Sequence, residues 1–140
     1  MELAFWKVAL RPGKPLIHGR LGGMAILGLP GNPVSSVVCA VLFVVPAIRR
    51  LLGDLTAGAD PTEPAVLGAD LPANDGRQDY LRATLAPSPG ALPAATALPV
   101  QDSSMLSILA RADALLVRPP HAPPARVGDA CRIIRLDRFA

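Results

Sequence analysis

The sequence predicts an α/β fragment with the order β-β-β-α, followed by a small all-β unit. Two observations carry this prediction. Three short apolar runs precede one long apolar helix pattern near the N-terminus, and the rest of the chain consists of short apolar runs between Pro, Gly and Asp. The polar stretch 54–64 (DLTAGADPTEP) separates the two textures, so we expect domains at 1–55 and 61–140. Hydrophobic residues make up 51% of the 140 residues, enough for a folded core.

Three strands are expected before the helix. The first covers 3–10 (LAFWKVAL), and RPGKP then forms a loop because its prolines cannot donate to a ladder. A hairpin follows, with strands at 16–21 and 24–29 joined by Gly22-Gly23. Three strands and one helix leave a sheet face and an edge uncovered, so we expect this part to be the end of a larger α/β domain.

The helix expected at 34–52 has recognisable ends. Asn32 is a good N-cap, and Pro33 fits the first helical position, where a missing N–H costs nothing. Apolar residues cover most of its circumference, so the helix is expected to be packed on several sides. Pro46 should kink the helix, and Gly53 is suited to end it.

The C-terminal unit contains several short apolar runs and one amphipathic segment. Residues 104–112 (SMLSILARA) read as a helix of about two turns. Five runs read as strands at a spacing that suits a small barrel or a sandwich: AVLGADLPA, DYLRATLAP, ALPAATALPV, ALLVRPP and ACRIIRLD.

Composition and charge narrow the function classes. The net charge is +3, but the basic residues are scattered, so we expect no nucleic-acid partner. The N-terminus lacks signal-peptide features and the longest apolar run is too short for a bilayer, so we expect no membrane partner and a cytoplasmic protein. Cys39 and Cys131 lack CxxC spacing, and the acidic residues and histidines are dispersed, so no metal site is expected in this chain.

The stretch 27–34 (LGLPGNPV) carries a functional signal. A strand, a rigid Gly/Pro corner and a helix start can together bind an anion, because the first helical turn has free N–H groups and partial positive charge. The same pattern also makes an ordinary helix cap, and both interpretations stay open at this point. The residues concerned are the preceding cations Lys7, Arg11 and Lys14 and the corner residues Gly28, Pro30, Gly31, Asn32 and Pro33.

Nearly the whole chain resembles the molybdopterin molybdenumtransferases, the MoeA family, which includes the C-terminal domain of gephyrin. The order FWKVALRPGKP, a short hairpin, GLPGNPVS and an apolar helix is specific to that family. GRQDYLRATL is similar to its GR-x-x-F/Y-x-R segment, QDSSMLSILARADALLVRP to its QGS-x-x-x-S stretch, and VGDACRII to its closing strand. The resemblance implies the end of a MogA-like molybdopterin-binding α/β domain, followed by the family's C-terminal β-barrel.

The resemblance also implies an activity and its residues. Family members insert molybdate into adenylyl-molybdopterin and release AMP in a step that depends on Mg²⁺. By position, Lys7 and Arg11 match two catalytic basic residues, although Lys is common at the second. Asp102 stands where the family usually has Gly, and an acid there is expected to repel an anionic ligand. The expected substrate-binding residues are Lys14, Gly28, Pro30, Gly31, Asn32, Pro33, Arg82 and Ser103.

The family's metal-binding acidic residues belong to an N-terminal part that this sequence lacks, so the Mg²⁺ ligands are expected from there. We therefore expect the chain to be the C-terminal part of such an enzyme, inactive alone, and to act as a homodimer or together with the missing N-terminal domains. The alternative is a non-catalytic binding or scaffold module derived from the same family. Ligand binding by Lys7 and Arg11 distinguishes the two.

Overall fold

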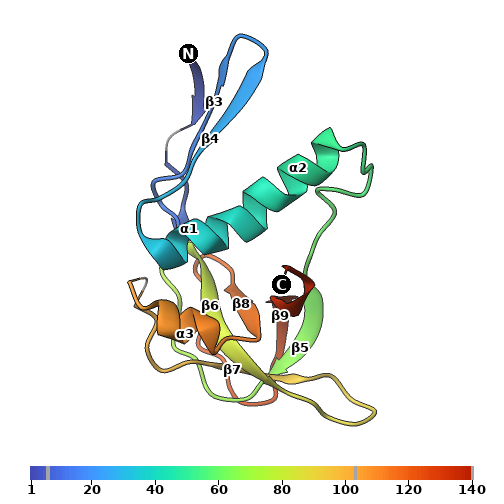
Figure 1. Ribbon diagram of the computed structural model, residues 1–140. Helices are drawn as coiled ribbons and strands as arrows, with labels where there is room; N and C mark the ends of the chain where they lie inside the picture. Colours follow the sequence, from blue (N-terminus) through green and yellow to red (C-terminus); the bar gives the residue numbers. More distant parts are fainter. Residues whose placement is uncertain (6, 103, 140) are drawn as a thin grey trace.

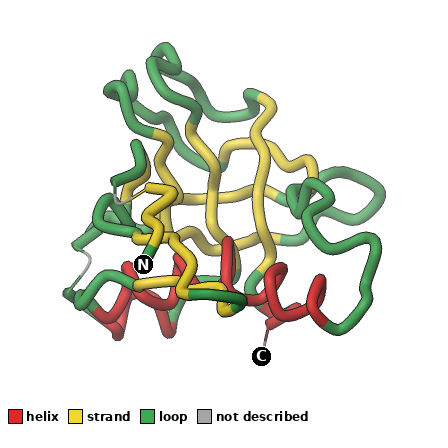
Figure 2. Tube along the Cα trace, turned by 90° about the horizontal axis from the view of Figure 1, so that it is seen from above, coloured by secondary structure: helices red, strands yellow, loops and turns green. Residues whose placement is uncertain are grey.

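The computed structural model describes residues 1–5, 7–102 and 104–139. A long helix lies across the outside of a β-barrel, and a three-stranded sheet projects beyond the helix (Figure 1). Seen from above, the helices gather along one side of the barrel strands (Figure 2). This arrangement confirms the expected α/β fragment followed by a small β-barrel.

The projecting sheet is antiparallel and confirms the predicted hairpin. Gly22 in its turn has a φ of +57°, which glycine adopts without strain. A Cβ on Gly19 would lie 2.6 Å from the carbonyl oxygen of Glu2, so only glycine lets the first strand approach this closely. The strands, in the order β1-β3-β4, are β1 (Glu2–Phe5), β3 (Ile17–Leu21) and β4 (Met24–Gly28).

The prediction of one strand at 3–10 is wrong. β1 ends at Phe5, and a separate strand, β2 (Leu10–Arg11), pairs in parallel with strand β6 of the barrel. The N–H of Gln78 donates to the carbonyl of Ala9 at 2.9 Å. Strand formation depends on the available pairing partner as well as on the local pattern, and here the apolar run divides between two sheets. The N-terminal part is thereby joined to the barrel.

Five strands close the barrel. β6 pairs with β7 and β8, β5 pairs with β7 and β9, and β8 pairs with β9; only the β5–β7 pairing is parallel. Because these pairings form a closed ring, the unit is a barrel and not a sandwich. The five predicted runs are confirmed as strands. They are β5 (Glu63–Leu67), β6 (Gln78–Ala86), β7 (Ala94–Ala97), β8 (Ala114–Arg118) and β9 (Ala130–Arg135).

The long helix has three consecutive parts: α1 (Pro33–Cys39), a π-helical segment (Ala40–Val44) and α2 (Val45–Leu51). The N-cap prediction is confirmed, because the side chain of Asn32 accepts from the N–H of Ser35 at 3.3 Å. The departure from α-helical geometry comes one turn before Pro46, where the N–H of Val45 donates to the carbonyl of Ala40.

By length and composition alone, the helix Pro33–Leu51 is long and apolar enough to cross a membrane, so the expectation that this run is too short for a bilayer is wrong. The core helix of a soluble protein passes the same test. The smaller predicted helix is confirmed as α3 (Leu106–Ala110), and a 3₁₀ turn, Asp137–Phe139, follows the last strand.

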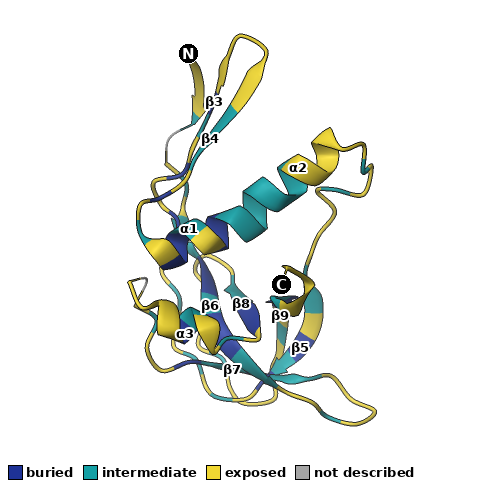
Figure 3. Cartoon of the chain, viewed as in Figure 1, coloured by how far each residue is buried: buried dark blue, intermediate teal, exposed yellow. Residues whose placement is uncertain are grey.

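Two apolar cores share the barrel wall. Since side chains alternate along a strand, one set fills the barrel, and on β6, β8 and β9 the other set faces α1. The outer core packs Val34 and Val38 of α1 against Tyr80, Leu115 and Ile134. Figure 3 shows that burial is concentrated in the barrel and α1, whereas much of the projecting sheet is exposed. The inner core consists of Ala65, Leu67, Ala83, Ala95, Ala114, Leu116 and Ile133.

Candidate functional site

The predicted corner lies between β4 and α1. Pro30 is buried, Gly28 and Asn32 are partly buried, and Gly31 and Pro33 are exposed. Asn32 supplies two acceptors to the helix, since its backbone carbonyl receives the N–H of Ser36 at 2.8 Å and its side chain that of Ser35. The corner therefore is a helix cap, as one of the two interpretations predicts. Anion binding at the corner stays a prediction.

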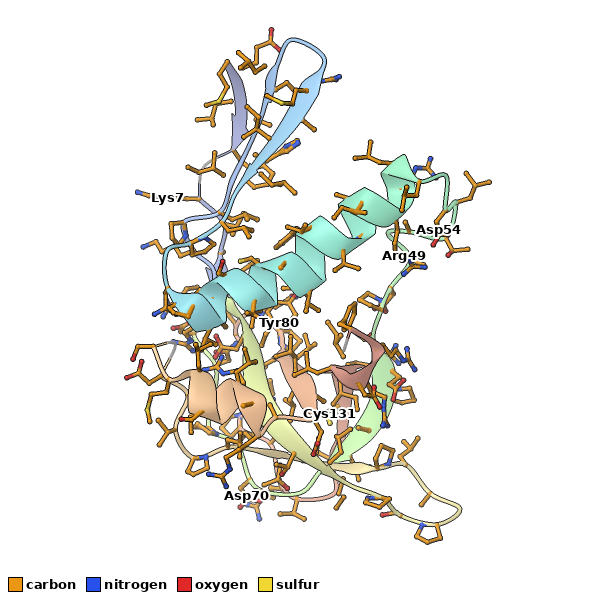
Figure 4. The ribbon with its side chains drawn as sticks, viewed as in Figure 1. Lys7, Arg49, Asp54, Asp70, Tyr80 and Cys131 are labelled. Carbon is orange, nitrogen blue, oxygen red and sulfur yellow. The ribbon has the colours of Figure 1, made fainter. Side chains whose placement is uncertain are left out.

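The loop that carries the two lysines packs against the same helix. The N–H of Val8 donates to the carbonyl of Lys14 at 3.0 Å and closes this loop. Gly13 is buried at a φ of +126°, and a Cβ there would lie 2.6 Å from Sγ of Cys39 in α1. Lys7 and Lys14 are both exposed, and Figure 4 shows the side chain of Lys7 pointing outward from the chain.

The guanidinium of Arg11 is bound to the barrel. Its Nε donates to Oδ1 of Asp79 at 2.7 Å and a terminal nitrogen donates to Oδ2, while further donors reach Asp75 at 3.1 Å and Asn74 at 3.3 Å. The hydrogen bond to Asp79 is the main reason that the pKa of Arg11 is raised. The structure thus places Arg11 among acceptors at the start of β6 and in the loop before it.

The side chain of Arg82 is buried, and the residue is only 2% exposed to solvent. It comes two residues after Tyr80 on β6 and therefore lies on the same face of the strand, the face that packs against α1. Figure 4 shows Tyr80 beneath that helix. The terminal nitrogens of Arg82 donate to the backbone carbonyls of Tyr80 at 3.0 Å and of Gln101, and its Nε has no partner among the described residues. Burial lowers the pKa of Arg82, because removal from water disfavours the charged form.

The loop before α3 is tied to this arginine by Gln101. The Gln101 side chain accepts from the N–H of Arg82 at 2.9 Å and donates to the carbonyls of Arg82 at 3.0 Å and Leu98 at 2.7 Å. α1 and α3 are in contact, so this loop lies near the start of α1 (Figure 1). The predicted site residue Ser103 lies outside the described residues.

Asp102 is engaged by its own loop. Its carboxylate accepts from the N–H of Ser104 at 2.8 Å and from the Ser104 hydroxyl at 2.7 Å, and these bonds lower the pKa of Asp102. Asp102 therefore stabilises the turn that leads into α3. Its charge is partly met by these donors, which reduces the repulsion that the sequence predicts for an anionic ligand.

Sequence reasoning missed two residues of this region, Asp79 and Gln101. Both lie inside the quoted segments GRQDYLRATL and QDSSMLSILARADALLVRP. Their pairing with Arg11 and Arg82 depends on contacts between distant parts of the chain, which the local pattern does not contain. The available signal was their position within motifs already singled out.

The described residues form a cavity but no cluster of metal ligands. In the part of the chain that the structure describes, no group of three or more His, Cys, Asp or Glu side chains could hold a metal ion. These residues therefore do not fit a Mg²⁺ site. A cavity of about 500 Å³ lies between α2, the 56–61 segment and the C-terminal turn, with Val45, Arg49, Ile134 and Phe139 in its wall.

Two family models match separate parts of the chain. Residues 64–136 match the family described as "MoeA C-terminal region (domain IV)", and residues 1–50 match the "Probable molybdopterin binding domain". The chain is 38% identical over 81 residues to the molybdopterin molybdenumtransferase of Haemophilus influenzae. This alignment covers 58% of the chain and 20% of the relative. The chain is 32% identical over 127 residues to the molybdopterin molybdenumtransferase of Synechocystis. That alignment covers 87% of the chain and 28% of the relative.

A solved structure of the molybdopterin biosynthesis moea protein from Pyrococcus horikoshii superposes with a TM-score of 0.75 at 25% identity, covering 95% of this chain and 32% of that one. The chain spans between a fifth and a third of the length of these relatives. Since the C-terminal match alone takes in residues 64–136 of 140, the chain belongs to the MoeA family of molybdopterin molybdenumtransferases and corresponds to its C-terminal portion.

Proposed function

We propose that the chain is the C-terminal part of an enzyme of molybdenum cofactor biosynthesis, which inserts molybdate into adenylyl-molybdopterin and releases AMP. The observation that carries the proposal is Arg82. It is a cation 2% exposed to solvent, with an unpartnered Nε and no carboxylate bonded to its guanidinium among the described residues. A buried charge without a paired acid is costly, and an anionic ligand would compensate it.

The proposed chemistry is electrostatic. Arg82 supplies a buried positive charge beneath α1, and the exposed Lys7 and Lys14 supply further positive charges on the loop that packs against that helix. Such groups orient a polyanionic substrate and stabilise the charge that develops when the two dithiolene sulfurs replace an oxo ligand of molybdate, which leaves as water with the thiol protons. The corner from Gly28 to Pro33 leads into the N-terminal end of α1, where the helix dipole favours negative charge.

The domain division at 1–55 and 61–140, a cytoplasmic location and association with a second copy or with further domains belong to this proposal. The relatives' greater length and the exposed apolar side chains of the projecting sheet support association. Because the described side chains offer no Mg²⁺ site, the proposal assigns the metal ligands to chain outside these residues, and no step here runs through the metal.

The test is complementation. The 140-residue chain is mixed with the N-terminal part of the Synechocystis relative, shortened to exclude the matched region, and AMP release from adenylyl-molybdopterin is measured with molybdate present. We expect activity in the mixture and none from either part alone. Arg82→Ala and Lys7→Ala should each raise the transition-state free energy by about 1.5–3 kcal/mol, the range for losing a hydrogen bond to a charged group.

Arg49→Ala is the matched control, because it removes the same charge at the far end of the helix, where Arg49 pairs with Asp54 (Figure 4). Full activity after both site substitutions would contradict the proposal and would favour a non-catalytic binding module.

A further inference from the structure

The pair Arg11–Asp79 joins the N-terminal part of the chain to the barrel. Two nitrogens of the guanidinium donate to the two oxygens of one carboxylate, with Nε to Oδ1 at 2.7 Å. The Asp79 side chain is 6% exposed, whereas that of Arg11 is 43% exposed. This fork geometry fixes the orientation of both groups, since a planar guanidinium matches a carboxylate along two parallel bonds.

Two further N–H groups of Arg11 are also engaged. They reach Asp75 and Asn74, and the amide of Asn74 donates in turn to the carbonyls of Arg77 at 2.8 Å and Pro119 at 2.9 Å. A ligand would have to displace several protein acceptors to be bound by this guanidinium. Arg11 is therefore built into the barrel, in contrast to Arg82 with its unpartnered Nε.

Asp79 lies where the parts of the proposed site meet. It pairs through β2 with the loop that carries Lys7 and Lys14, and this loop packs against α1 at Cys39. On the other side, Asp79 stands three residues before Arg82 on β6. Fixing Arg11 on Asp79 thus fixes the lysine loop and the helix relative to the buried arginine.

We infer that Asp79 is a positioning residue of the proposed site, and that Arg11 acts as its clamp partner instead of contacting the ligand. The inference rests on the proposed function, in which Lys7, Lys14 and Arg82 hold the anion. The change in anion affinity in Asp79→Asn distinguishes this inference from a ligand-contact role of Arg11, because the two predict changes of opposite sign. Asp79→Asn removes a negative charge and frees Arg11, so a ligand-contacting Arg11 predicts tighter anion binding, whereas a clamp predicts weaker binding.

The experiment uses the full 140-residue chain, with AMP as the probe, in an NMR titration that measures weak affinities. In Asp79→Asn we expect the dissociation constant for AMP to rise about tenfold, which corresponds to about 1.4 kcal/mol. Amide hydrogen exchange at Gln78, whose N–H bonds to Ala9, should become about tenfold faster for the same reason. The amide of Gly68, bonded to Ala95 at 2.9 Å, should keep its protection and so report an intact barrel.

Two further variants complete the test. Arg11→Lys keeps the positive charge but not the two-donor fork, and we expect it to change AMP affinity and Gln78 exchange in the same direction as Asp79→Asn. Asp54→Asn is the matched control, since it breaks an Arg–Asp pair at the other end of the helix and should change neither quantity. Tighter AMP binding by Asp79→Asn, or unchanged Gln78 exchange, overturns the inference. A wild-type chain that binds no AMP contradicts the proposed function itself, and Gln78 exchange then still decides whether Asp79 clamps β2.

Discussion

Leu115 and Leu116 are neighbours in β8, both are fully buried, and their side chains belong to different cores. Leu115 faces Val34 and Val38 of α1, while Leu116 faces the barrel interior. Strand alternation makes this one segment the shared wall between helix and barrel. The helix therefore depends for its packing on the correct register of β8.

The two leucines predict separable effects. Leu115→Ala and Leu116→Ala should each lower the free energy of unfolding by about 2–5 kcal/mol, the range for a Leu-to-Ala change in a core. Only Leu115→Ala should increase hydrogen exchange in α1 more than in the barrel strands. Urea unfolding and hydrogen exchange followed by mass spectrometry measure both quantities. Equal exchange changes in α1 and the barrel for Leu115→Ala would contradict the two-core description.

Gly13→Ala should destabilise the chain by about 1–3 kcal/mol through overpacking, because its Cβ would lie 2.6 Å from Sγ of Cys39. Gly58→Ala is the matched control: Gly58 also has a positive φ, +94°, but its Cβ would meet no atom within 4 Å. Thermal unfolding of both variants separates the clash from the backbone strain. Cys39→Ala should restore part of the stability in the Gly13→Ala background, and equal losses in the two glycine variants would refute the contact.

Acid should destabilise the chain through Asp54 and Asp75. Hydrogen bonds from Thr56 lower the pKa of Asp54 to about 2, and a hydrogen bond from Arg77 is the main cause of the same shift at Asp75. Since both folded-state pKa values lie below the ordinary aspartate value of 3.8, this stabilisation is present above about pH 4 and is lost as the pH falls through about 2. The melting temperature of Asp54→Asn/Asp75→Asn should therefore fall less between pH 4 and pH 2 than that of the wild type. Parallel curves for the two proteins would exclude this origin of the acid sensitivity.

The projecting sheet should drive self-association of the isolated chain. In the observed register Leu3 lies opposite Gly19 and Leu21 opposite Met24, which gathers apolar side chains on one face, and Leu21 and Met24 are 53% and 57% exposed. Leu21→Ser/Met24→Ser should lower the sedimentation coefficient and the binding of a hydrophobic dye. Val127→Ser, which changes an apolar residue 62% exposed on a barrel loop, should leave both unchanged. A wild-type chain that sediments as a monomer would disprove the expectation.

Most of the fold could be predicted because its elements have strong local signals. Asn32 and Pro33 mark the helix start, and Gly22-Gly23 mark the hairpin turn, so these boundaries follow from residue chemistry. β2 could not be predicted, since its two residues form a strand only because β6 offers them an edge. The π-helical segment 40–44 likewise has no local signal in an apolar run.

The candidate site was predictable in its residue types and not in its connections. The resemblance implies a catalytic role for Arg11 and a substrate-binding role for Arg82, both as basic residues in matching motifs. The structure gives them opposite environments: Arg11 has acidic partners, whereas Arg82 is buried against backbone carbonyls. This difference arises from which distant residues the fold brings beside each guanidinium, which a linear pattern does not encode.

The pairing of β2 with β6 also sets an order of events when the chain folds. Arg11 and Asp79 are 68 residues apart, so closing that loop has an entropic cost that two strand residues repay only after β6 is already held between its barrel neighbours. The barrel and the helix should therefore assemble first. During synthesis the segment around Arg11 leaves the ribosome before any barrel strand exists, and it should be among the last to reach its native place.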